Sequence, residues 1–161
     1  YLQATTEASM IQFTLSQTIN RPVDEVFAYW ADPDNVPAWQ GGVVSYRRTS
    51  SGSLGVGTTY AITRKALGLR QETAGEYTAY EHNRRVCERI EAGPAKYTIE
   101  TVFTAQGQTT RVDIETQIDL SGLLGRLGEK AAGRPIRKQA AQDHAKIKAL
   151  LESRPPRPRP S

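Results

Sequence analysis

Residues 19–45, INRPVDEVFAYWADPDNVPAWQGGVVS, decide the fold of this chain of 161 residues. Pro22 stands at the start of a predicted helix, where its missing amide hydrogen is tolerated, and Asp24 and Glu25 suit the positive end of the helix dipole. The apolar side chains on the inner face of this helix are Val26, Phe27 and Trp30. Asp32-Pro33 then interrupts the chain, and residues 34–42, DNVPAWQGG, predict a short second helix that ends at its two glycines.

Strand-like segments flank these two helices. Before them, Met10–Asn20 alternates apolar and polar side chains with the period of two that is typical of a half-buried strand. After them, turn signals recur at hairpin spacing at positions 51–52, 67–68, 82–83, 92–94 and 106–107. The segments between these turns are Val43–Thr49, Thr58–Ala66, Arg70–Tyr80, Arg84–Glu91, Ala95–Ala105 and Thr109–Leu120. Because such short turns join antiparallel neighbours, the seven segments predict one antiparallel sheet.

Residues 123–152 switch to a helical period, with Ala140, His144, Ile147 and Leu151 on one face. Gly133 and Pro135 interrupt this segment, and proline removes one backbone hydrogen bond. We therefore expect either one long helix kinked near Gly133-Pro135 or a short helix followed by a longer one. The fold class is α+β: a seven-stranded antiparallel sheet, two short helices after the first strand, and a long C-terminal helix.

The two ends of the chain differ in composition from residues 10–152, for which we expect a single domain. Residues 1–9, YLQATTEAS, lack the apolar core of a signal peptide, so we expect a cytoplasmic protein. These residues are a cloning remnant, a processed extension or a native extension. Residues 153–161, SRPPRPRPS, alternate arginine and proline, a pattern typical of a disordered, extended tail.

Composition excludes several classes of protein. No segment approaches the roughly 20 apolar residues of a membrane helix. Cys87 is the only cysteine, and His82 and His144 lie 62 positions apart, so we expect no disulfide framework, no metal and no cofactor. Removing the three arginines of the tail and Glu7 from the net charge of +4 leaves +2 for residues 10–152. That small charge argues against a nucleic-acid partner.

The order of elements and the stretch at 19–45 resemble the SRPBCC (START-like) superfamily, in particular its polyketide cyclase/dehydrase and lipid-transport branch. The marks are the proline that opens the first helix, Val-Phe inside it, Asp-Pro after it, and the tryptophan that closes the second helix. Further matching segments are Gly55–Tyr60, Glu81–Val86, Thr110–Val112, Gly122–Gly125 and Lys148–Glu152. The resemblance implies a helix-grip fold, in which a curved sheet and the long helix enclose a cavity for apolar or aromatic small molecules.

Polar side chains that point into such a cavity are the candidates for chemistry. Alternation in Thr58–Lys65 places Tyr60, Ile62 and Arg64 on the inner face. Arg64 would then need a partner or an anionic ligand, unless it reaches solvent at the sheet margin. His144 lies on the inner helix face, where it acts as an acid/base, hydrogen-bonds a ligand, or is simply a histidine at the edge of the core. The candidate catalytic residues are thus His144, Arg64 and Tyr60.

Ligand contacts are expected from side chains assigned to the inner face: Phe13, Trp39, Tyr60, Ile62, Arg64, Tyr97, Phe103, Ile114 and His144. Trp30 fits either the core or the ligand site. The Tyr97 hydroxyl is placed to orient a ligand oxygen. Cys87 has no activating base in the sequence around it, which indicates a structural thiol. The basic residues from Arg134 to Lys138 are a solvated helix face or, together with the tail, a weak attraction to membranes.

Three hypotheses for function follow. The first is a protein that sequesters or carries a small hydrophobic, ring-containing or lipid-like ligand. The second is a polyketide aromatase/cyclase, in which the cavity orients a poly-carbonyl chain and Tyr, Arg or His assists enolisation and dehydration. The third is an accessory or stress-response module that acts through its surface and tail without a ligand.

Overall fold

The structure, a computed structural model, describes residues 10–66, 68–120 and 125–158. Expectations for residues 1–9, for Leu67 in its predicted turn, for residues 121–124 and for the end of the tail at 159–161 lie outside these residues.

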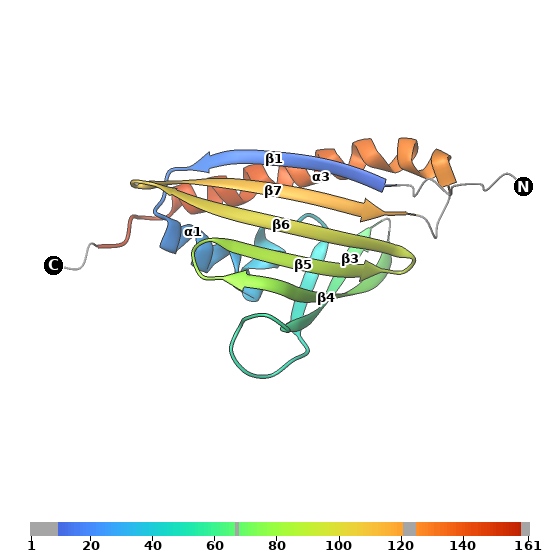
Figure 1. Ribbon diagram of the computed structural model, residues 1–161, viewed down its shortest axis with the longest axis horizontal. Coiled ribbons are helices and arrows are strands. Elements are labelled where there is room, and N and C mark those ends of the chain that lie inside the picture. Colours follow the sequence, from blue (N-terminus) through green and yellow to red (C-terminus); the bar gives the residue numbers. More distant parts are fainter. Residues whose placement is uncertain (1–9, 67, 121–124, 159–161) are drawn as a thin grey trace, which may run out of the picture.

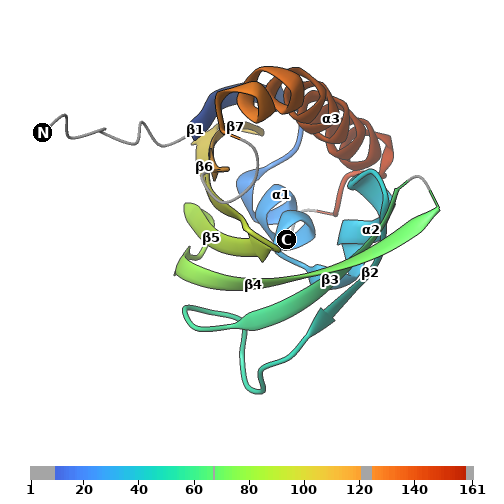
Figure 2. The same cartoon turned by 90° about the vertical axis from the view of Figure 1, so that its right-hand side faces the viewer.

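Seven strands form one antiparallel sheet, which confirms the predicted fold class. The strands are β1 (Met10–Ile19), β2 (Val43–Arg48), β3 (Thr59–Ala66), β4 (Leu69–Glu81), β5 (Arg85–Ala92), β6 (Ala95–Gln106) and β7 (Thr109–Asp119). Their order across the sheet is β1-β7-β6-β5-β4-β3-β2, so the first strand pairs with the last (Figure 1). Seen end-on, the sheet curves around the helices, which all lie on its concave side (Figure 2).

Every predicted turn site contains a residue with positive φ: Gly52, Gly68, Asn83, Gly93 and Gly107. Gly107, with φ 64°, lies in the short connection between β6 and β7, where a side chain would be strained. Asn83, with φ 60°, is the one non-glycine residue of this kind in the described chain. Asparagine tolerates the left-handed region better than most residues, so the turn between β4 and β5 keeps its shape.

Two short helices and one 3₁₀ turn fill one end of the concave side: α1 (Val23–Trp30), η1 (Pro33–Asn35) and α2 (Val36–Trp39). The carboxylate of Asp32 accepts a hydrogen bond of 3.0 Å from the Asp34 amide and so caps η1. Val26 and Phe27 of α1 are almost completely buried. These helices therefore close the end of the sheet over which they lie.

The long helix α3 (Gly125–Ser153) passes through Pro135 without a break, so the single-helix alternative is the one observed. Pro135 and Ala131, whose carbonyl loses its partner at the proline, both belong to the exposed side of the helix, where water can satisfy the carbonyl. On the opposite side His144, Ile147 and Leu151 are buried against the sheet and α1. Figure 2 shows α3 lying across the mouth of the curved sheet.

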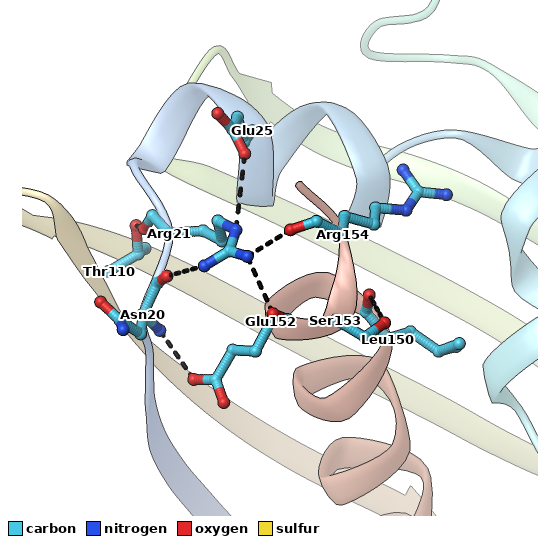
Figure 3. Close-up of polar contacts among 8 residues, drawn as sticks. All are labelled: Asn20, Arg21, Glu25, Thr110, Leu150, Glu152, Ser153 and Arg154. Carbon is cyan, nitrogen blue, oxygen red and sulfur yellow. Dashed lines mark hydrogen bonds and ion pairs between the residues drawn. The ribbon is translucent and has the colours of Figure 1, made fainter. Parts of the chain in front are cut away.

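Arg21 ties the C-terminal end of α3 to the junction of β1 and α1 (Figure 3). Its guanidinium donates hydrogen bonds to three backbone carbonyls, those of Asn20 (2.7 Å), Glu152 (2.8 Å) and Arg154. The Asn20 amide donates in return to the Glu152 carboxylate at 2.8 Å, and Thr110 donates to the Arg21 carbonyl. This end of the helix is therefore firmly fixed.

Apolar side chains gather in two clusters. The larger contains the aromatic residues of α1 and α2 and reaches Ile147 and Leu151 of α3. The smaller, formed by Ile11, Ala95, Ile118 and Leu120, lies toward the other end of the sheet. A cavity borders both clusters.

Candidate ligand site

The cavity has a volume of about 290 Å³ and lies between the concave face of the sheet and α3. Its wall is mostly apolar, with contributions from Phe13, Leu15, Trp30, Trp39, Ile90, Ala92, Tyr97, Ile99, Ile114, Ile118, Ile136 and Ala140. Its polar wall residues are Gln40, Arg64, Gln71, Thr73, Glu88, Thr101, Thr116, Gln139, Asp143 and His144. A concave site whose wall combines apolar side chains with placed polar groups is the usual form of a small-molecule site.

Most of the residues predicted to contact a ligand line this cavity: Phe13, Trp39, Arg64, Tyr97, Ile114 and His144. Trp30, which the sequence assigned to either the core or the ligand site, lines the cavity as well.

Three residues of the predicted set, Tyr60, Ile62 and Phe103, lie outside the wall, in the packed core. Phe103 is covered by Phe27 of α1, with ring centroids 5.2 Å apart. Tyr60 stacks on Tyr46 at 4.5 Å. These residues do face inward, but helices and tyrosine rings fill the space in front of them.

Arg64 of β3 is half-buried and belongs to the polar part of the cavity wall. Its Nη2 donates a hydrogen bond of 3.0 Å to Oε1 of Gln40, the residue that follows α2. Burial lowers the pKa of the guanidinium, and the charges of Asp143 and Glu88 partly oppose this effect. A side chain of this kind binds oxygen ligands as a multiple donor.

Glu88 of β5 is a wall residue that the sequence analysis missed. The Tyr60 hydroxyl donates to its carboxyl at 2.5 Å, so Tyr60 acts on the cavity through Glu88. Burial raises the pKa of Glu88 above its usual range, against the opposing effects of the Tyr60 bond and the Arg64 charge. Strand periodicity places Glu88 on the same face as the apolar residues Val86 and Ile90, which was the one local signal for its inward position.

His144 of α3 lies against Trp30, with the two rings edge to face and 5.6 Å apart. Only 9% of the residue is exposed, and burial lowers the pKa of its imidazole to about 4. At neutral pH the ring is therefore uncharged and offers one donor and one acceptor nitrogen.

Trp30 and Trp39 form the aromatic part of the wall, with ring centroids 5.2 Å apart. Trp39 is 6% exposed, and its indole N–H has no hydrogen-bond partner in the described part of the chain. A shallower groove of about 450 Å³ lies outside, between β1 and α3, and shares Leu15 and His144 with the cavity wall.

The convex face carries the ion pairs expected of a solvated surface. Glu76 pairs with Arg89 at 3.0 Å, and Glu100 pairs with Arg85 at 2.6 Å. The thiol of Cys87 donates to Glu100, and burial raises its pKa to about 11, so it is a poor nucleophile at neutral pH.

Fold and cavity together define a helix-grip protein. A family model described as polyketide cyclase/dehydrase and lipid transport matches residues 10–152. The chain therefore belongs to this family. No curated protein sequence is similar to the chain.

Several solved structures share the fold. Ara h 8.0201 has a TM-score of 0.74 at 14% identity, over 90% of this chain and 99% of the other. The ZhuI aromatase/cyclase from Streptomyces sp. R1128 has a TM-score of 0.74 at 11% identity, over 89% and 94%. TTHA0849 from Thermus thermophilus has a TM-score of 0.72 at 17% identity, over 87% and 96%. At these identities the likeness concerns the fold. In the described part of this chain, no helix has the length and apolar character needed to cross a membrane.

Proposed function

We propose that this protein binds a small hydrophobic, ring-containing or lipid-like molecule in the cavity, and thereby sequesters or carries it. The observation that supports this function is the cavity itself, whose largely apolar wall is built from the sheet, the segment α1 to α2 and α3. Moving apolar ligand surface from water into such a site releases about 25 cal/mol per Å². The cytoplasmic location expected from the sequence is part of the same proposal.

The size of the cavity limits the ligand. At about 290 Å³ it lies just below the usual range for small-molecule sites, which is roughly 300–1,000 Å³. A molecule of one or two rings fits this space better than an extended poly-carbonyl chain does. Size therefore favours binding over the polyketide cyclase alternative.

The cyclase alternative is supported by a different observation. Arg64, Glu88 and His144 bring a cation, a carboxyl group of raised pKa and an uncharged imidazole to one cavity. Such a set suits proton transfer next to a carbonyl. In that case His144→Gln would lower turnover far more than it weakens binding, whereas equal losses indicate binding alone.

Native mass spectrometry of the full chain, purified without a tag, tests the proposed function. We expect an adduct of one small molecule per chain, which solvent extraction then releases for identification. An apo mass that persists after incubation with a panel of one- and two-ring hydrophobic compounds would contradict it, and would favour the module that acts through its surface and tail.

A further inference from the structure

The cavity wall holds a positive charge, that of Arg64, for which the described part of the chain supplies no ion-pair partner. The bond from Arg64 Nη2 to the neutral amide of Gln40 is the one hydrogen bond of this guanidinium in the described chain. Burying a cation is unfavourable unless an anion or several hydrogen bonds compensate for the lost water. The other N–H groups of Arg64 are therefore available to a molecule in the cavity.

The two carboxyl groups whose charges act on Arg64 accept hydrogen bonds from other residues. Asp143 accepts hydrogen bonds from the Gly41 amide at 2.9 Å and from the Gln139 side chain at 2.8 Å. Glu88 accepts from the Tyr60 hydroxyl at 2.5 Å. Both act on Arg64 through their charge, but neither is within ion-pair distance of it. The hydrogen bonds of Asp143 and Glu88 to other residues keep both carboxyl groups out of ion-pair distance of Arg64. The Arg64 guanidinium can therefore bind another acceptor.

The remainder of the wall restricts what this acceptor can be attached to. Trp30, Trp39 and Ile90 line the cavity together with Arg64, and Ile114 and Ile118 continue the apolar surface along β7. A small hydrophilic anion would leave these side chains without contacts. The body of the ligand must therefore be apolar.

We propose that the cavity binds an apolar carboxylic acid, whose carboxylate pairs with Arg64 while its ring or chain lies against Trp30, Trp39 and Ile90. A guanidinium presents two parallel N–H groups that match the two oxygens of a carboxylate, which a single hydroxyl or ketone does not. This inference rests on the proposed function, since it names the class of ligand for the same cavity.

Glu88 makes this binding depend on pH. The groups that interact with it are the hydroxyl of Tyr60, the guanidinium of Arg64, and the hydroxyls of Tyr46 and Tyr77. From α3, Asp143 and His144 line the same cavity. An ionised Glu88 repels an incoming carboxylate, whereas the protonated form does not. Since burial raises the pKa of Glu88, affinity for the acid falls as pH rises through that pKa, while His144 stays uncharged.

Two probes of nearly equal shape test the inference: 2-naphthoate and the uncharged 2-naphthamide. Each is titrated calorimetrically into the full chain at about pH 6, where a simple carboxylic acid is ionised. We expect naphthoate to bind at least about tenfold more tightly than naphthamide. Arg64→Met should weaken naphthoate binding at least about tenfold and change naphthamide binding less than about twofold.

Arg89→Met is the matched control, because Arg89 neighbours Glu88 on β5 but pairs with Glu76 on the convex face. It should leave the affinity for both probes unchanged. Should Arg64→Met fail to fold, as judged by circular dichroism, Arg64→Lys replaces it. Lysine keeps the charge but lacks the paired N–H groups, and we expect it to weaken naphthoate binding selectively.

The outcomes separate the two claims. Equal affinity of the wild-type protein for both probes, or an unchanged preference for naphthoate in the Arg64 variant, overturns the inference and leaves the proposed function standing. Absence of binding by either probe counts against the proposed function itself. Glu88→Gln should remove the fall in naphthoate affinity that accompanies rising pH, and a fall that persists in this variant contradicts the role given to Glu88.

Discussion

Two arginines of this fold have contrasting surroundings. One lies at the C-terminal end of α3, which we call the closed end, and the other lies in the cavity wall, which we call the cavity end. Arg21, at the closed end, donates to three backbone carbonyls and lies 4.0 Å from the Glu25 carboxylate. Arg64, at the cavity end, donates to a single amide oxygen. Both are largely removed from water, and both come from the inner side of the fold.

The difference shows how a structural arginine is distinguished from a ligand-binding one. Three backbone carbonyls of the chain itself bind the terminal nitrogens of Arg21, although its buried Nε has no hydrogen-bond partner among the described residues. These interactions stabilise the folded protein. Most of the Arg64 donors have no acceptor among the described residues, so they are free to stabilise a complex. The interactions at the closed end therefore stabilise the folded protein, and those at the cavity end determine which ligand binds.

Arg21→Met should give the largest loss of stability, since it leaves three carbonyls without their charged donor. We expect the free energy of unfolding to fall by about 3–4 kcal/mol, measured by urea denaturation. A loss below about 1 kcal/mol would show that water satisfies the three carbonyls about as well as Arg21 does. The hydrogen bonds of Arg21 would then not be what holds α3 in place.

His144→Gln should change how the protein responds to acid. Because the pKa of His144 is lowered from 6.5 to about 4 in the folded state, the unfolded chain binds the proton first. Stability from this residue is complete above about pH 6.5 and is lost as pH falls toward 4, by an amount on the order of 2–3 kcal/mol. The variant should lack this loss in denaturation curves at the two pH values.

The matched control for that experiment is His82→Gln, which replaces an exposed histidine between β4 and β5. This control should keep the acid sensitivity of the wild-type protein. If the His144 variant lost stability with falling pH as steeply as the wild type does, the buried imidazole would not be its source.

Glu88→Gln should shift stability in the opposite direction with pH. The pKa of Glu88 is raised above 4.5 in the folded state, so the folded protein binds the proton more tightly than the unfolded chain does. The stability from this residue is therefore complete below about pH 4.5 and is lost as pH rises through the raised pKa. The melting temperature of the variant, relative to the wild type, should therefore be higher at about pH 8 than at about pH 5. An equal difference at both values would contradict the raised pKa.

Arg64→Met should have the smallest effect on stability. Removing a cation that has one neutral partner leaves few unsatisfied groups, and the free energy of unfolding should change by less than about 1 kcal/mol in the absence of ligand. A large loss would mean that Arg64 is structural like Arg21, and the contrast between the two ends would disappear.

The sequence predicted the features that depend on neighbouring residues, but not those that depend on contacts between distant segments. Strand alternation and turn residues are local, and they predicted all seven strands and placed Arg64 on the inner face. Local patterns do not tell whether an inward-facing residue lies in the core or in the cavity wall, because this depends on whether α1 covers it. For that reason Phe103 packs against Phe27 and lies in the core, whereas Tyr97 on the same strand lines the cavity.

Glu88 was missed for a related reason. A carboxylate in a strand is normally a solvated residue, and the sequence around it is rich in charge. Its position in the wall depends on Tyr60, which lies 28 positions earlier and is held over Gly75. A Cβ at Gly75 would approach the Tyr60 ring to 2.2 Å, so the position of Tyr60 requires glycine there. The sequence around Glu88 does not reveal this contact.

Nuclear magnetic resonance compares the two arginines in a single experiment. The side-chain Nε–H signals of Arg21 and Arg64 are followed in the full chain while 2-naphthoate is added, with assignments from the Arg21→Met and Arg64→Met variants. We predict that the Arg64 signal and the amide signals of β3, β5 and α2 shift with saturation, and that the Arg21 signal stays in place. Shifts confined to the closed end or to the outer groove between β1 and α3, with the Arg64 signal unmoved, would contradict the assignment of the cavity as a binding site for apolar acids.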